Sequence, residues 1–157
     1  MNSTVEQMDA VVARLKSYVS PTLGRSVSQL TAGHVYNEHG GKNVVSAVAK
    51  FPHVTVRKVN AQSDPQVMSR ENFDVEILVH HRGRPNGHRA EEIADVAEQA
   101  MLSWLDSSPS VGLTVGQSVR RDTLPMVDSV SHLREVVTVR LVVGCYAWSK
   151  RTTAVFA

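Results

Sequence analysis

The chain is poor in aromatic residues and has a single cysteine. Aromatic residues make up 5% of its 157 residues, so the core must be built mainly from valine, leucine, isoleucine and alanine. Cys145 has no partner for a disulfide within the chain, and its place in an apolar strand pattern predicts a buried structural thiol. We therefore expect a protein that folds in a reducing compartment without disulfide stabilisation.

Long hydrophobic runs and a strong net charge are also missing. No apolar stretch approaches the roughly 18 residues of a membrane-spanning helix, and the N-terminal residues do not match a signal peptide. Lysine and arginine number 17 against 15 aspartates and glutamates, which gives a formal net charge of +2. So balanced a chain is not expected to capture nucleic acid or an anionic membrane by charge alone. The sequence predicts a soluble protein with no membrane partner and no sequence-specific nucleic-acid partner.

What the sequence does contain is two regular strand patterns in its second half. Phe73, Val75, Ile77 and Val79 fall on one face of an extended segment, and a second alternation runs through residues 137–146. Strict period-two alternation predicts strands with one face on a core and the other on solvent or a partner.

Between these strands lies the pattern of an amphipathic helix that begins at Asn86 or Gly87 and ends before the turn at 107–110. Its apolar stripe consists of Ile93, Val96, Ala97, Ala100, Met101, Trp104 and Leu105. The exposed side carries Glu91, Glu92, Asp95 and Glu98. These acids lie mostly in the N-terminal half, where the helix dipole favours negative charge.

Taken together, the patterns predict a single domain over residues 1–157 with a core over 50–148. The other expected elements are a helix over 4–19 stopped by Pro21, a long loop over 20–43 with a short strand near 34–36, and strands over 53–59, 73–80, 111–121 and 133–148. The expected connections are a polar excursion over 60–72, a loop over 122–131 and a loose tail over 149–157; residues 44–49 fit a helix or a strand equally. This order predicts an α+β fold with a mainly antiparallel sheet, two flanking helices and long loops.

Histidines offer the only metal-like grouping in the sequence. His34, Glu38 and His39 are close together, but their spacing matches neither helical zinc pattern, and the stretch is rich in glycine. His80 and His81 are adjacent in a strand, so their side chains point to opposite faces and cannot bind one ion together. A small metal-binding enzyme that uses the first three residues is kept as an alternative.

Other catalytic and phosphate-binding devices have no clear counterpart. There is no Gly-x-Ser-x-Gly elbow, and Cys145 lies in a strand where its thiolate is not favoured. Asp74 and Glu76 share a strand face, which an exposed charged surface explains more simply than a catalytic pair. The Gly40–Asn43 turn lacks Walker spacing. Basic residues occur in small groups, such as Arg82 with Arg84, Arg120 with Arg121, and Lys150 with Arg151. The sequence therefore favours a protein that is not an enzyme.

The last strand indicates an assembly role. Val136, Val142 and Tyr146 lie beside Arg140 on its second face, so uncharged residues occupy both faces near its end. An open strand of this length is an aggregation hazard. We hypothesise that another copy of the same protein covers it, as in a closed ring.

The element order over roughly residues 50–148 resembles that of a known family. It comprises the strand at 73–80, a charged turn, a helix that ends Ala-Met-Leu-Ser-Trp-Leu, a polar strand, and a closing Val-Val-Thr-Val-Arg-Leu-Val-Val-Gly-Cys-Tyr. In this pattern the chain resembles the tail terminator (tail completion, minor tail protein U-like) family of long-tailed bacteriophages. The long 20–43 segment and the 60–72 excursion depart from the compact members.

The resemblance implies a virion protein made in the host cytoplasm, with an α+β fold and neither catalysis nor a cofactor. Six copies would form a ring that caps the tail tube, stops its polymerisation and offers a surface to a head-completion or neck protein. A neck or head-completion connector is the alternative within this class, and a nucleic-acid-binding or ligand-binding domain is one outside it. We expect inter-subunit surfaces at Arg82, Arg84, Glu91, Glu92, Asp95, Arg140 and Tyr146.

Overall fold

The structure, a computed structural model, describes residues 4–45, 50–63, 66, 70–82, 87–104, 113–127 and 135–148. Within these ranges the helices are α1 (Thr4–Ser17), α2 (Val27–Leu30) and α3 (Gly87–Leu102). The strands are β1 (Val35–Asn37), β2 (His53–Ser63), β3 (Arg70–Arg82), β4 (Leu113–Val127) and β5 (Glu135–Trp148). They form one sheet in the order β1-β2-β3-β5-β4, in which only β1 and β2 are parallel. The predicted α+β class with a mainly antiparallel sheet is confirmed.

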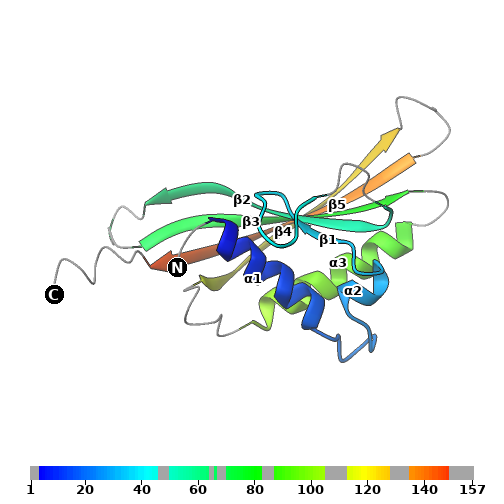
Figure 1. The fold of residues 1–157 in the computed structure, drawn as a ribbon, viewed down its shortest axis with the longest axis horizontal. Coiled ribbons are helices and arrows are strands. Elements are labelled where there is room, and N and C mark those ends of the chain that lie inside the picture. Colours follow the sequence, from blue (N-terminus) through cyan, green and yellow to red (C-terminus); the bar gives the residue numbers. More distant parts are fainter. Residues whose placement is uncertain are drawn as a thin grey trace.

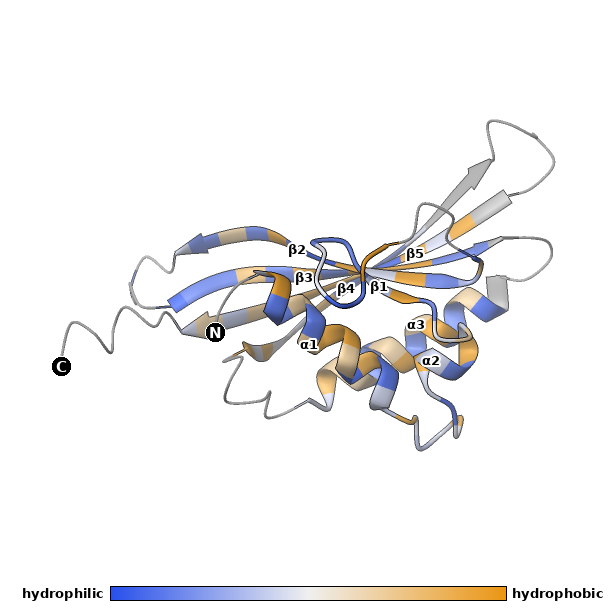
Figure 2. Cartoon of the chain, in the orientation of Figure 1, coloured by the Kyte–Doolittle hydropathy of each residue, from blue (hydrophilic) through white to orange (hydrophobic). Residues whose placement is uncertain are grey.

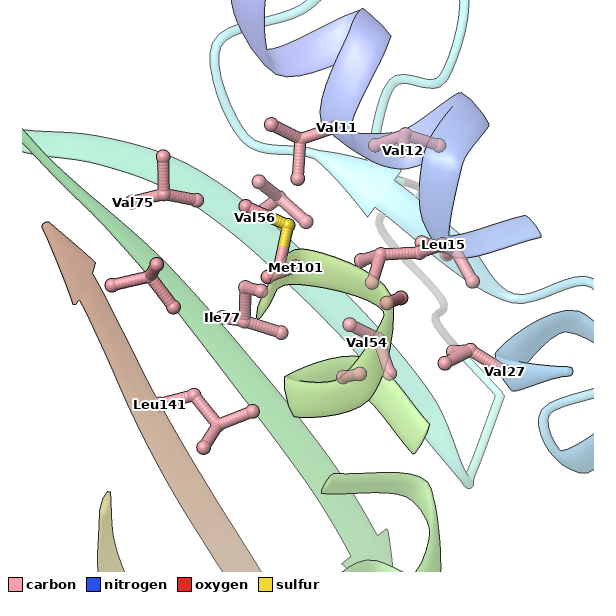
Figure 3. Packing of buried hydrophobic residues seen from close by; sticks show 14 of the residues in the cluster. Val11, Val12, Leu15, Val27, Val54, Val56, Val75, Ile77, Met101 and Leu141 are labelled. Carbon is pink, nitrogen blue, oxygen red and sulfur yellow. The ribbon is translucent and has the colours of Figure 1, made fainter. Parts of the chain in front are cut away.

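The described helices pack on one face of the sheet, as Figure 1 shows. Hydrophobic and hydrophilic residues alternate along β2 and β3 (Figure 2), and the hydrophobic ones face the helices. Figure 3 shows Val11 and Leu15 of α1 and Met101 of α3 packed with Val56 and Ile77 of the sheet. Burial of each such side chain contributes roughly 1.5–3 kcal/mol. The helices are therefore held by an aliphatic core, as the composition predicts.

The two alternating patterns form neighbouring strands. Phe73, Val75, Ile77 and Val79 are all at most 3% exposed and lie in the core. The register places them opposite Cys145, Val143, Leu141 and Val139 of β5. The strand predicted over 133–148 is thus confirmed from residue 135, where the described part of that segment begins.

Three strands, β2, β3 and β4, are longer than the sequence predicts. β2 continues to Ser63 and β3 already begins at Arg70, so residues 60–63 and 70–72 are strand and the predicted excursion is wrong there. Gln62 and Ser63 pair with Asn72 and Glu71 beyond a bulge at residues 60 and 61. β4 continues through Pro125 to Val127, so the predicted loop is wrong over 122–127. A proline is tolerated because β4 is an edge strand, where a missing N–H need not break a ladder.

The segment over 20–43 has more structure than the predicted loop. A capping box starts α2, with the Gln29 amide donating to Ser26 Oγ at 3.1 Å and the Ser26 amide donating to Gln29 Oε1 at 2.9 Å. β1 follows at the place expected for a short strand. Val44 forms an isolated β-bridge with Asn37. Three other segments of the prediction lie outside the described residues, namely 46–49, the turn at 107–110 and the tail over 149–157.

None of the described helices is long and apolar enough to cross a membrane.

Candidate functional site

The sheet face opposite the described helices, here named the outer face, carries several of the predicted site residues. The strand register arranges its side chains in rows that run from β2 through β3 and β5 to β4. Three of these rows are His53–His80–Thr138, Thr55–Leu78–Arg140–Asp122 and Arg57–Glu76–Val142–Arg120. Polar, charged and aliphatic side chains therefore share one broad surface that no described helix covers.

Charges in two of these rows are paired within the chain. Arg57 contacts the buried carboxylate of Glu76 through Nη2 at 2.5 Å and Nε at 2.6 Å. Arg140, one of the predicted interface residues, donates from Nη2 to Asp122 Oδ2 at 2.7 Å. This hydrogen bond raises the pKa of Arg140. Arg140 is therefore on the outer face as expected, with a carboxylate of its own chain beside it.

Two aromatic residues and an arginine lie close together where β3 begins and the neighbouring strand β5 ends. The guanidinium of Arg70 lies 4.9 Å from the ring centre of Tyr146, and the Trp148 ring meets Tyr146 edge-on at 6.4 Å. Trp148 is 49% exposed, although it is a large apolar side chain. Tryptophan, tyrosine and arginine are the residue types that dominate the binding energy of protein interfaces. Tyr146 thus lies in a cluster with the composition of an interface.

Two of the acidic residues predicted on the long helix, Glu91 and Asp95, have partners on β4. Arg121 donates to Asp95 Oδ1 at 2.7 Å and to the Glu91 carbonyl at 3.0 Å, and its Nη2 lies 3.1 Å from Glu91 Oε2. Glu92 is exposed on the same helix. This ion pair was not predicted from the sequence. A usable signal was present, because Arg121 lies on the same side of its strand as Leu113, which faces the core and the helices.

The two turn arginines complete the predicted interface set. Arg82 closes β3, where its backbone is paired with Val136, and Arg84 lies outside the described residues. The pairing of these arginines with the acidic helix side of another copy stays a prediction.

The histidines and the glutamate that suggested a metal site have separate partners. His34 Nδ1 lies 2.9 Å from Tyr36 Oη, Glu38 lies 3.8 Å from Arg57, and His39 Nε2 accepts the Lys58 amide at 2.9 Å. Across the described part of the chain, no group of three histidine, cysteine, aspartate or glutamate side chains has the geometry to hold a metal ion. The three side chains thus make separate local contacts in this structure.

A pair of stacked histidines on the outer face was not predicted. The rings of His53 and His80 lie 4.6 Å apart at 29°. His80 Nδ1 is 3.1 Å from Thr138 Oγ1, and its Nε2 is 3.4 Å from Thr55 Oγ1. Burial, with a smaller contribution from His53, lowers the pKa of His80 to about 4, and burial also lowers the pKa of His53. Both rings are therefore neutral at pH 7.

Cys145 is a structural thiol, as the sequence predicts. It is 5% exposed within β5, and burial, aided by the charge of Asp74, raises its pKa to about 12. Because the thiolate is the reactive form, we expect almost no reaction of the native protein with a disulfide reagent at pH 8. One equivalent should react after unfolding in urea, and absorbance of the released thiol measures both. Rapid labelling of the native protein would contradict this assignment.

Comparisons with known proteins give a likeness of fold. No protein-family model and no curated protein sequence match this chain. Among solved structures, the fold matches a chain described as "Virion of native gene transfer agent (GTA) particle", with a TM-score of 0.55 and 13% identity. The match covers 88% of this chain and 93% of that chain. The protein therefore shares its fold, over nearly its whole length, with a chain from that virion.

Proposed function

We propose that this protein is a structural component of a phage-like virion, and specifically a tail terminator. In this role a ring of copies caps the tail tube and forms part of the head–tail joint. The observation that carries the proposal is the fold shared with a chain of the gene transfer agent virion, which extends over 93% of that chain. The element order over residues 50–148, taken from the sequence alone, supports the same class.

The sheet edges support assembly with further copies. β4 is an edge strand of 15 residues, and in the described part of the chain no strand pairs with its outer side. At the opposite side of the sheet, β1 covers β2 only from Val54 to Val56. One molecule thus offers two unlike edges, and contact between unlike surfaces is heterologous, which generates rings when the rotation closes.

The chemistry of the described side chains supports a structural role over a catalytic one. Cys145 is buried with a raised pKa, and His34 and His39 have hydrogen-bond partners in the fold. We propose a hexameric ring with the tail tube protein and a head-completion or neck protein as its partners, located at the head–tail interface of the virion. No catalytic step or cofactor belongs to this role.

The test is the growth of tail tubes in the presence of the protein. The tube protein of the same particle is polymerised with and without a fivefold molar excess of the terminator candidate, and tube lengths are measured by electron microscopy. We expect shorter tubes, with gold-labelled protein at one end only. Unchanged lengths and unlabelled ends would contradict the terminator role. Labelled ends with unchanged lengths would assign the protein to the neck instead.

A further inference from the structure

A hollow in the outer face lies beside the Tyr146 and Trp148 cluster. Its volume is about 360 Å³, enough for one side chain of a partner. Both flanking strands bulge next to it, β2 between Val59 and Gln62 and β4 between Val115 and Val119. A bulge bends its strand and interrupts the row of paired side chains, so the two irregularities open the surface at one place.

Two glycines keep the floor of the hollow clear. Gly144 of β5 and Gly116 of β4 line it. A Cβ atom at Gly116 would lie 2.9 Å from the Gly144 carbonyl oxygen, a backbone atom that cannot move aside alone. At Gly144 a Cβ would lie 3.5 Å from Ser118 Cβ and 4.0 Å from Asp74 Oδ1, which are ordinary contacts, so an added side chain there would occupy the hollow itself. The absence of side chains at both positions is what creates the space.

The lining combines apolar surface, from Phe73 and Tyr146 among others, with polar groups and one negative charge. Asn60, Gln62 and Ser118 supply amide and hydroxyl groups, and Asp74 supplies a carboxylate. Asn60, held at a φ of 56°, donates from Nδ2 to Asp74 Oδ2 at 3.0 Å and so fixes the carboxylate. This carboxylate also contributes to the raised pKa of Cys145.

The negative charge of Asp74 is not balanced within the described part of the chain. Glu76 and Asp122 on the same face are paired with Arg57 and Arg140, whereas no described cation lies within ion-pair distance of Asp74. The carboxylate can accept further hydrogen bonds, and the Gln62 and Ser118 groups that line the hollow can also accept, so the site suits a cationic partner that donates several hydrogen bonds. Guanidinium and ammonium groups have this chemistry.

We propose that the hollow receives an arginine or lysine side chain of a neighbouring copy, whose cationic head pairs with Asp74. This inference rests on the ring assembly proposed above and names one of its contacts. The chain has a surplus of cations, and Arg25 and Arg120 are exposed with no described ion pair. Arg120 shares the outer face with the hollow, whereas Arg25 lies between α1 and α2. A negative hollow on one surface and a cation without a described ion pair on another suit a heterologous contact. The exposed Trp148, whose ring contacts Tyr146 of the lining, adds apolar area that a neighbour would bury.

The experiment compares Asp74→Asn with the matched variant Asp122→Asn. The first keeps the side-chain shape and the acceptor for Asn60, and it removes only the charge. The second removes a carboxylate from the same face that already has an intrachain partner. Self-association is followed by sedimentation velocity over a concentration series. We expect Asp74→Asn to raise the dissociation constant about tenfold or more. Asp122→Asn should change it less than about threefold.

A second experiment measures cation binding in the hollow directly and does not require assembly. The protein is titrated with Nα-acetyl-arginine amide, or with the uncharged citrulline analogue, and followed by ¹⁵N NMR. Saturable shifts at Asn60 and Ser118 with arginine alone, lost in Asp74→Asn, support the site. If wild-type protein neither associates nor caps tubes, the proposed function fails while this titration still decides the cation site. Unchanged association of Asp74→Asn overturns the proposal, and so does an effect confined to tube binding, which assigns the hollow to another protein.

Discussion

Replacing Lys58 by alanine is expected to lower the free energy of unfolding by about 3 kcal/mol. The Lys58 side chain is 6% exposed on the helix face of β2, where its Nζ pairs with Glu71 and donates to Gln7 Oε1 at 3.0 Å. It also lies 4.5 Å from the ring centre of Phe73. Removal would leave the fully buried Gln7 oxygen and the Glu71 carboxylate without their donor. Urea unfolding followed by circular dichroism measures the loss.

Two variants show whether the buried contacts of Lys58 cause this effect. Lys42→Ala, which changes an exposed lysine, is expected to alter stability by less than about 0.5 kcal/mol. The double variant Lys58→Met with Gln7→Leu removes the lysine charge together with the Gln7 amide that would otherwise lose its donor. It should recover most of the lost free energy of unfolding. A Lys58→Ala protein as stable as the wild type would show that α1 does not depend on this contact.

Acid is expected to destabilise the fold before its carboxylates titrate. The pKa of His80 is about 4 in the folded protein, against roughly 6.5 for an unfolded chain, so the unfolded state takes up the proton first. Stability is therefore complete above about pH 6.5 and falls as the pH drops toward 4. The shift of His80 alone corresponds to about 3 kcal/mol, and the lowered pKa of His53 adds to the loss.

The measurement is the urea midpoint between pH 7 and pH 5, a window above the usual aspartate and glutamate pKa values. His80→Gln keeps hydrogen-bonding groups near Thr55 and Thr138 and cannot take a proton. It should be less stable at pH 7 but lose less stability on acidification than the wild type, with the remaining loss due to His53, which still titrates. A wild-type midpoint that does not move between pH 7 and pH 5 would exclude the stacked pair as an acid-sensitive element.

Local patterns predicted the strand and helix identities well but not their ends. The alternation at Phe73–Val79 and the apolar stripe of α3 are consequences of burial on one side, which sequence periodicity records directly. The extra lengths of β2, β3 and β4 come from ladder bonds to neighbouring strands, and these extend over polar residues and Pro125 that look like loop. The short helix α2 had a usable signal, the Ser26 and Gln29 capping box, inside a glycine-rich stretch.

For the candidate site, the alternation of residues along one strand predicted which face a side chain lies on, and no more. Arg140 and Tyr146 were placed on the second face of β5, which is the outer face. The stacked histidines and the hollow at Asp74 depend on which strands are neighbours, and no single-strand pattern contains that information. For the same reason the tie from Arg121 to Asp95 was missed, because it joins residues from two elements.

The most direct test of the ring assembly is the mass of the protein over a concentration series, by sedimentation velocity, alone and with tail tubes present. The account predicts a species of about 103 kDa, six times the chain mass of 17.2 kDa, that grows with concentration or appears on the tubes. A mass of 17.2 kDa at every concentration, with no protein sedimenting on the tubes, would contradict it.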